Sequence, residues 1–144
     1  MPTATAVDPV TLANRLRPVL LKLNRHLRRE IHSLGVTGGQ VSLLVAIKQH
    51  PQIGVRELAA LERMSPAGMS KYVARLEEAG LVARSGGPDR RRVGLTLTAE
   101  GARVLRSVKS RRTAWLAARL RGLSQEELEA VDRAIEPLQE LIEE

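Results

Sequence analysis

Apolar residues recur every three or four positions along most of this 144-residue chain, which is the period of one face of an amphipathic α-helix. The first such stretch runs from about Pro9 to Leu34 and predicts one long helix. The apolar face of this helix consists of Leu12, Leu16, Val19, Leu23, Leu27, Ile31 and Leu34. Pro18 lies inside the stretch, so we expect a lost hydrogen bond and a bent axis, unless the helix begins later.

Capping residues indicate where the following helices begin. Thr37 and Gln40 have the spacing of a capping box, in which two side chains satisfy free backbone N–H groups at a helix start. Ser124 and Glu127 repeat that spacing near the C-terminal end. The expected helices cover about residues 37–50, 55–62, 65–79, 98–121 and the segment from 124 onward.

The last of these helices has an apolar face of its own. This face consists of Leu128, Val131, Ile135, Leu138 and Ile142. Pro137 interrupts the segment, so we expect a kink at that point.

The helical period changes between Gly80 and Thr98. Residues 81–84 and 93–97 have the pattern of two short strands, and residues 85–92 between them are rich in turn formers. This pattern predicts a β-hairpin with a long basic tip. The expected fold class is therefore mainly α with a small β-hairpin wing, in which a winged helix-turn-helix is flanked by N- and C-terminal helices.

The helix that follows Ser65 has the features of a DNA-recognition helix. Ser65 is a good N-cap and Pro66 fits the first helical position, so the free N–H groups and positive dipole of this end can face phosphates. Met69, Val73 and Leu76 share one stripe and should pack inward. The candidate DNA-binding residues of this helix are Ser65, Ala67, Gly68, Ser70, Lys71 and Arg75. The alternative is a solvated helix face with ordinary basic residues.

Tyr72 is open to two interpretations. Its hydroxyl could reach a phosphate, but we expect its ring to pack against the neighbouring helix.

The tip of the expected hairpin carries Arg90, Arg91 and Arg92 after two glycines and a proline. An arginine on a thin loop can enter the minor groove, where the potential of DNA is most negative. Asp89 is unsuited to DNA contact, but its carboxylate can orient the guanidinium of Arg91. The alternative is a solvated turn with a run of charge.

Charge and composition narrow the function classes. The net charge is +7, and residues 124–144 carry eight acids against one base, which leaves +14 for residues 1–123. A basic body suggests a polyanionic partner. The chain has no cysteine, no signal peptide pattern and no apolar run near the roughly 20 residues of a membrane span, which fits a cytoplasmic protein.

Enzyme and metal chemistry find little support in the sequence. We see no Ser/His/Asp set and no phosphate-binding glycine loop, and His26, His32 and His50 lack metal-ligand spacing. We therefore expect no enzyme activity, no metal and no cofactor.

The sequence resembles the MarR family of winged-helix transcriptional regulators along nearly its whole length. The segment 89–98, followed by Gly101, is similar to the family's wing pattern, with Asp89 and Arg91 at its start. The segment 55–59 resembles the family's third helix, and 65–84 resembles its recognition helix and first strand.

The resemblance implies one protomer over residues 1–144, with a DNA-binding lobe at 36–98 and a helical dimerisation region at 9–35 and 99–144. The flanking helices are also too apolar to serve a lone lobe. The residues we expect in dimerisation are Leu12, Leu16, Leu128, Val131, Ile135 and Leu138.

The function that the resemblance implies is a homodimeric regulator of transcription, which we expect to be a repressor on a pseudo-palindromic operator. Carried over by position, Arg91 would enter the minor groove, while Ser70 and Lys71 would read the major groove. A small lipophilic or aromatic-acid effector is a further implied partner, although Trp115 and Tyr72 are the only aromatic residues available for stacking. The alternative is an architectural or protein-interaction module that reads no sequence.

Overall fold

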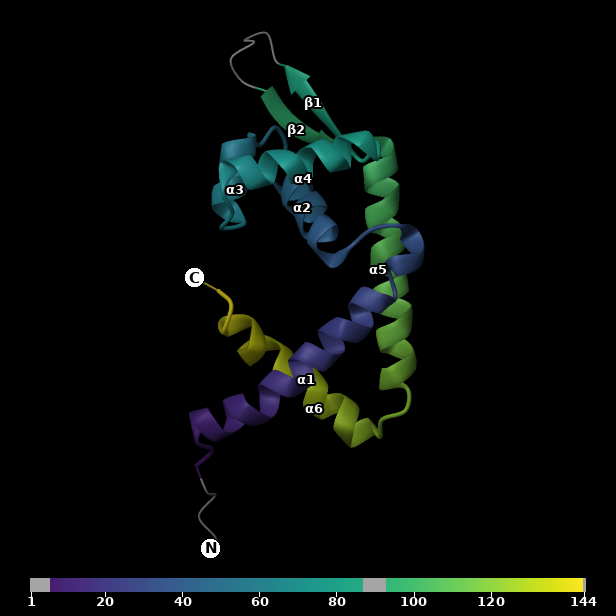
Figure 1. Ribbon diagram of the computed structural model, residues 1–144. Coiled ribbons are helices and arrows are strands. Elements are labelled where there is room, and N and C mark those ends of the chain that lie inside the picture. The colour runs from purple at the N-terminus through teal and green to yellow at the C-terminus, as the bar shows by residue number, and fades with distance from the viewer. Residues whose placement is uncertain (1–5, 87–92, 144) are drawn as a thin grey trace, which may run out of the picture.

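The computed structural model describes residues 6–86 and 93–143, and it confirms a mainly helical fold with one small hairpin (Figure 1). The elements are α1 (Pro9–Arg29), the 3₁₀ helix η1 (His32–Leu34), α2 (Gly38–Gln49), α3 (Val55–Leu61), α4 (Pro66–Glu78), β1 (Val82–Gly86), β2 (Val93–Leu97), α5 (Ala99–Leu120) and α6 (Gln125–Glu140). No helix in these described ranges is long and apolar enough to cross a membrane.

The first helix differs from the sequence-based expectation at its C-terminal end. We expected one helix to Leu34, but α1 ends at Arg29 and a 3₁₀ turn follows, closed by Gly35 in the left-handed region (φ +75°). This reversal lets Ile31 turn into the core, where it is fully buried. The helical spacing of apolar residues continues past Arg29 because Ile31 and Leu34 also contact the core, although they do so from a turn and not from α1.

Both prolines lie inside continuous helices. Pro18 is in the middle of α1, which begins at Pro9, so a later helix start is excluded. Pro137 lies in the last turn of α6, which continues to Glu140.

The expected capping boxes are both present. Gln40 N–H donates to Thr37 Oγ1 at 3.1 Å, and Ser124 N–H donates to Glu127 Oε1 at 3.0 Å. The hydrogen bond from Ser124 N–H lowers the pKa of Glu127, so the stabilisation from this cap is lost as the pH falls through that lowered pKa. The group is exposed, and the effect is therefore small.

The hydrophobic core lies in the lobe built from α2, α3, α4, the hairpin and the first half of α5. The buried residues are all apolar in the described part of the chain. Those fully buried with the largest side chains are Ile31, Leu44, Ile47, Leu58, Met69, Val73, Leu76 and Leu95. Val104 and Val108 of α5 belong to the same cluster, so the core extends beyond residues 36–98.

The end of α4 and the start of α5 are held together by Thr98. Its Oγ1 donates to the carbonyl of Gly80 at 2.6 Å and accepts from Gly101 N–H at 3.0 Å. Gly101 is buried against the Leu81 carbonyl, so closely that a Cβ at this position would overlap the oxygen. The C-terminal end of α4 is therefore joined firmly to α5.

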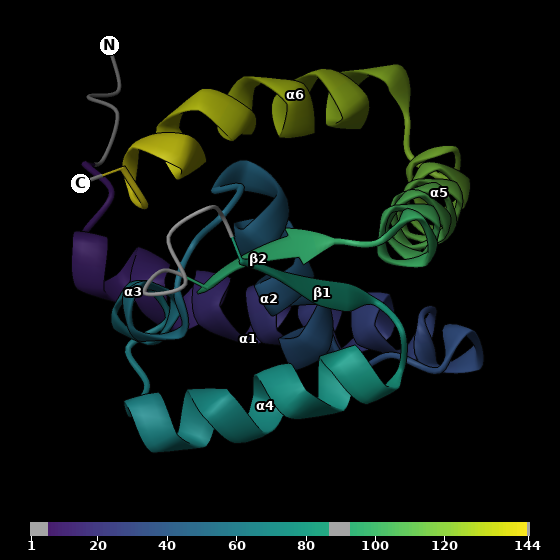
Figure 2. The same ribbon diagram turned by 90° about the horizontal axis from the view of Figure 1, so that it is seen from above.

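Two helices extend from the lobe as arms. In Figure 1 α1 and α6 cross in projection, but Figure 2 shows that they lie well apart in depth. Neither α1 nor α6 contains a buried residue. The arm α1 is tied to α5 by His26, whose ring stacks on Trp115 with 5.2 Å between centroids.

Candidate nucleic-acid interface

The helix-turn-helix is formed by α3, a tight turn and α4. After α3 ends at Leu61 the chain reverses through Arg63, which has a positive φ of +54°, and Met64 N–H donates to the Ala59 carbonyl at 2.8 Å. Ser65 Oγ then accepts from Gly68 N–H at 3.1 Å, which starts α4. The Ser65 hydroxyl is thus occupied as a cap, as its position before Pro66 predicts.

The two faces of α4 differ as the sequence predicted. Met69, Val73 and Leu76 are fully buried. The candidate DNA-binding residues lie on the other face, where Gly68 is half-buried and the exposed positions are Ser65, Ala67, Ser70, Lys71 and Arg75. The exposed face combines small residues at the N-terminal end with two cations behind them, so it can approach a polyanion closely.

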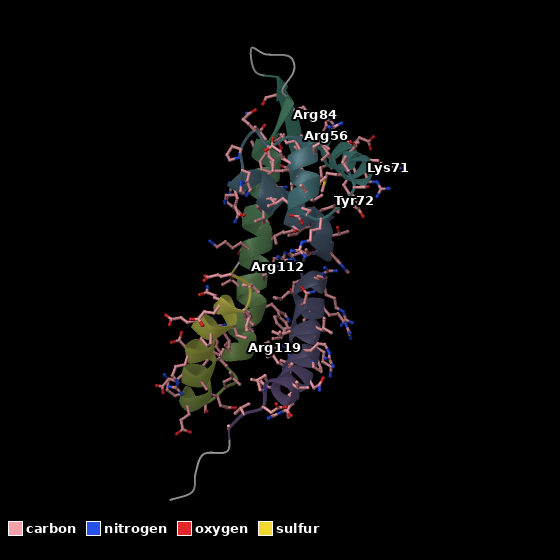
Figure 3. The ribbon with its side chains drawn as sticks, turned by 90° about the vertical axis from the view of Figure 1, so that its left-hand side faces the viewer. Arg56, Lys71, Tyr72, Arg84, Arg112 and Arg119 are labelled. Carbon is pink, nitrogen blue, oxygen red and sulfur yellow. The ribbon has the colours of Figure 1, made fainter. Side chains whose placement is uncertain are left out.

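The ring of Tyr72 is partly exposed, and its packing against the neighbouring helix stays a prediction. Tyr72 remains 42% exposed, and the Arg75 guanidinium lies 6.0 Å from the centroid of its ring. Figure 3 shows Tyr72 close to Lys71 on α4.

The base of the wing is anchored to the lobe by a third strand-like segment. β1 and β2 pair antiparallel with Val82 opposite Leu97, and Leu95 N–H donates to the Ile53 carbonyl at 2.8 Å. Gly94 packs on Gln52, whose Cα lies 2.7 Å from the position a Cβ would take. A side chain at 94 would therefore push the hairpin away from the lobe.

The tip of the wing lies outside the described residues. Asp89, Arg90, Arg91 and Arg92 all belong to this segment, so their contacts with DNA and with one another stay predictions.

Two basic residues near α4 were not among the DNA-binding candidates taken from the sequence. Arg56 is exposed on α3, and Arg84 on β1 donates from Nε to Glu77 Oε1 of α4 at 2.7 Å. Figure 3 places both near the wing end of the molecule, above Lys71. No spacing rule marks them, because their positions depend on how α3 and the hairpin pack around α4.

A cavity of about 480 Å³ lies between the lobe, the C-terminal end of α1 and the middle of α5. Its polar lining includes Arg28 of α1, Ser42 of α2 and His50 at its end, Glu62 after α3, and Arg112 of α5. Ser42 Oγ donates to Glu62 Oε2 at 3.3 Å. The lining residues come from four separate segments, so no local motif could have revealed them.

Arg112 is the most unusual residue of this cavity. Its Nε is buried and has no hydrogen-bond partner among the described residues. It also lines a neighbouring cavity of about 500 Å³ between α2 and α5. Figure 3 shows Arg112 at the junction of lobe and arms. A buried guanidinium N–H without a partner is costly, and an anion in the cavity would satisfy it.

The helix-turn-helix with its adjoining hairpin defines the class of winged-helix DNA-binding regulators. A model described as the MarR family matches residues 34–92 of the chain. Relatives of 30% identity or more match along most of the chain. The chain belongs to the MarR family of transcriptional regulators.

Curated relatives include helix-turn-helix regulators from two bacterial groups. A transcriptional regulator of Mycobacterium bovis is 30% identical over 134 residues, covering 92% of this chain and 94% of that protein. The transcriptional repressor MdtR of Bacillus subtilis is 31% identical over 114 residues, covering 78% of this chain and 74% of that protein.

Solved structures agree in fold. The crystal structure of a Pseudomonas aeruginosa protein described as a transcriptional regulator superposes with a TM-score of 0.84 at 29% identity, covering 94% of this chain and 96% of that one. A MarR family protein from Bacillus stearothermophilus superposes with a TM-score of 0.80 at 27% identity, covering 96% and 100%.

Proposed function

We propose that the chain is a sequence-specific repressor that binds double-stranded DNA as a homodimer on a pseudo-palindromic operator. The observation that carries this proposal is the division of α4 into a fully buried apolar face and an exposed face of small and basic residues. A relative named as a repressor supports the direction of regulation. Such a protein acts by occupying a promoter.

The proposed DNA contacts follow from the positions of the exposed residues. The N-terminal half of α4 enters the major groove, where Lys71 reaches a base edge or phosphate, and Arg56 holds a neighbouring phosphate from α3. Residues 90–92 of the wing reach the minor groove, oriented by Asp89. The lobe at 36–98 carries these contacts, and residues 9–35 and 99–144 join two protomers.

The homodimer is proposed because the arms expose apolar stripes. Leu12 and Leu16 on α1, and Leu128, Val131, Ile135 and Leu138 on α6, share these stripes, and neither helix has a buried residue in the single chain. Exposed apolar surface of this extent marks an interface. A two-fold axis would present two copies of α4 to half-sites about one helical turn apart.

The direct test is fluorescence anisotropy with DNA from immediately upstream of the gene, beside a scrambled duplex, across a salt series. A preference of about 10³-fold or more for the native duplex is expected. Equal and steeply salt-dependent binding to both duplexes would contradict sequence-specific binding at this DNA and favour an architectural module.

Replacing Lys71 by alanine is expected to weaken binding to the native duplex by roughly 10- to 100-fold, because a contact to a base edge contributes about 1–3 kcal/mol of discrimination. Binding to the scrambled duplex should change much less. Lys109→Ala is the matched control, because it removes the same charge from α5, outside the helix-turn-helix. Equal losses on both duplexes would assign Lys71 to phosphate contact instead of base reading.

We also propose that a small anion acts as an effector in the cavity at Arg112. The lining includes the cations Arg28 and Arg112 against the carboxylate of Glu62. Neither Trp115 nor Tyr72 lines it, so charge, and not ring stacking, would select the ligand. An anion there would contact α1, α2 and α5 together and so change the angle between lobe and arms.

Benzoate serves as a probe of this site, with benzyl alcohol as its uncharged counterpart. We expect millimolar benzoate to lower DNA affinity at least tenfold and benzyl alcohol to have no such effect. Arg112→Met should abolish the benzoate response and keep DNA binding. Arg111→Met is the matched control, because Arg111 lines neither cavity. A response that survives Arg112→Met would overturn the assignment.

A further inference from the structure

We infer that Gln52 is a positioning residue for DNA binding, because it holds both strands of the wing at one place in the hairpin and so sets the direction in which the wing leaves the lobe. The inference rests on the proposed contact of the wing with DNA, and it adds to that proposal the residue that aims the wing.

Gln52 lies in the turn between α2 and α3, in a conformation that its residue type disfavours. Ile53 N–H donates to the His50 carbonyl at 3.1 Å, Pro51 is the second residue of the turn, and Gln52, the third, has a φ of +68°. These are the features of a type II turn, whose third residue is usually glycine because a Cβ is strained there. The local backbone therefore favours glycine at position 52, and the glutamine needs a reason from elsewhere in the fold.

The side chain of Gln52 provides that reason through its contact with β1. Ser85 Oγ donates to Gln52 Oε1 at 2.8 Å, although the two residues are 33 positions apart in the sequence. A glycine in the turn would leave the Ser85 hydroxyl without this acceptor. The contact thus joins the first strand of the wing to the segment that connects α2 and α3.

The backbone of Gln52 contacts the other strand, β2. Its N–H donates to the Leu95 carbonyl at 3.0 Å. Gly94 lies so close that a Cβ at this position would be 2.7 Å from the Gln52 Cα and 2.8 Å from its carbonyl oxygen. Ser85 and Gly94 are partners in the register of the hairpin. Gln52 therefore holds β1 and β2 at the same pair of residues.

The pair held by Gln52 lies near the outer end of the described hairpin. Among the described pairs, only Gly86 with Val93 lies farther out. Figure 1 shows that β1 and β2 project from the lobe beyond α3 and α4. Rotation of a hairpin about its base displaces its outer end most, so a loose contact at Gln52 would misplace the arginines at 90–92 relative to DNA.

Replacing Gln52 by glycine tests this role. Glycine adopts a positive φ without strain, so the turn should be kept while the contact with Ser85 is lost. We expect affinity for the native duplex to fall about 2- to 10-fold, the factor that corresponds to one hydrogen bond, and Tm to change little. Ser85→Ala removes the donor on β1 and should have a similar effect. The double variant should bind no more weakly than either single variant, because both changes remove one contact.

The salt dependence of DNA binding separates positioning from a loss of folded protein. A smaller folded fraction lowers the apparent affinity by a similar factor at every salt concentration. A misplaced wing instead loses contacts with phosphates, so the slope of log affinity against log salt becomes less steep. Fluorescence anisotropy between about 50 and 200 mM salt measures this slope. Ser110→Ala, the matched control, removes a hydroxyl from α5, outside the hairpin and the turn, and should change neither affinity nor slope.

Arg91→Ala distinguishes this inference from the proposed wing contact on which it rests. Arg91→Ala should weaken binding and reduce the slope, and Gln52→Gly should then add less than it does in the native chain. No effect of Arg91→Ala on affinity or slope would contradict the proposed wing contact itself. Native affinity and slope in both Gln52→Gly and Ser85→Ala, beside a weakened Arg91→Ala, would overturn the role of Gln52 and leave the wing contact standing. A lower affinity with an unchanged slope and a lower Tm would assign Gln52 to stability alone.

Discussion

Replacing Ile135 by glutamate is expected to turn the protein into monomers at micromolar concentration and to remove specific DNA binding with it. Ile135 is 48% exposed in the single chain and lies in the middle of the apolar stripe of α6. In a two-fold dimer the new carboxylate enters the interface twice without a cation opposite it. An unpaired buried charge costs about 3–5 kcal/mol, so a dissociation constant at least ~10³-fold higher is expected.

Size-exclusion chromatography with light scattering measures this change directly. Ala130→Glu adds the same charge to the exposed opposite side of α6 and should remain dimeric. Ile135→Ala, which adds no charge, should raise the dissociation constant by a smaller factor. This milder variant still tests the interface if the Ile135→Glu protein fails to fold. A fully dimeric Ile135→Glu protein with native helix content would remove α6 from the interface.

Gly101→Ala is expected to lower thermal stability more than a Gly→Ala substitution at any other glycine of the α-helices. The Cβ would overlap the carbonyl oxygen of Leu81, a backbone atom that cannot rotate away. Relief requires α5 to move from the end of α4, which would strain the hydrogen bond of Thr98 to Gly80. Overpacking of this kind costs about 1–3 kcal/mol, which lowers Tm by roughly 2–12 °C in a chain of this size.

The matched substitution is Gly39→Ala. Gly39 is also helical but exposed, and the nearest atom to its added Cβ, Thr37 Oγ1, is 3.9 Å away. Alanine there should raise stability by about 0.4–1 kcal/mol, because it restricts the unfolded chain and favours the helix. Differential scanning calorimetry compares the two. Equal Tm values for both variants would show that α5 can shift freely against the lobe.

Gly101 also shows how a sequence can mark a position without giving its reason. The residue was part of the resemblance to the family's wing pattern, and helix propensity alone would disfavour glycine there. The structure gives the reason for glycine, because the Leu81 carbonyl lies too close to Gly101 to leave room for a Cβ.

Local physics explains why so much of the lobe could be predicted. Capping at Thr37, Ser65 and Ser124 depends on residues three positions apart, and the stripe of Met69, Val73 and Leu76 depends on helix periodicity alone. The predicted C-terminal end of α1 was wrong for the same reason. Ile31 and Leu34 keep the spacing of a helix, although the chain turns at Gly35.

The amino-acid sequence by itself determined the order of the elements, the buried face of α4 and the concentration of acid near the C-terminal end, because each is a property of neighbours along the chain. Only the tertiary structure decided that the Nε atom of Arg112 is buried at a cavity, that Arg84 pairs with Glu77, and that α1 and α6 stand apart with their apolar stripes uncovered. These features join residues distant in sequence, and their geometry is set by how the helices pack.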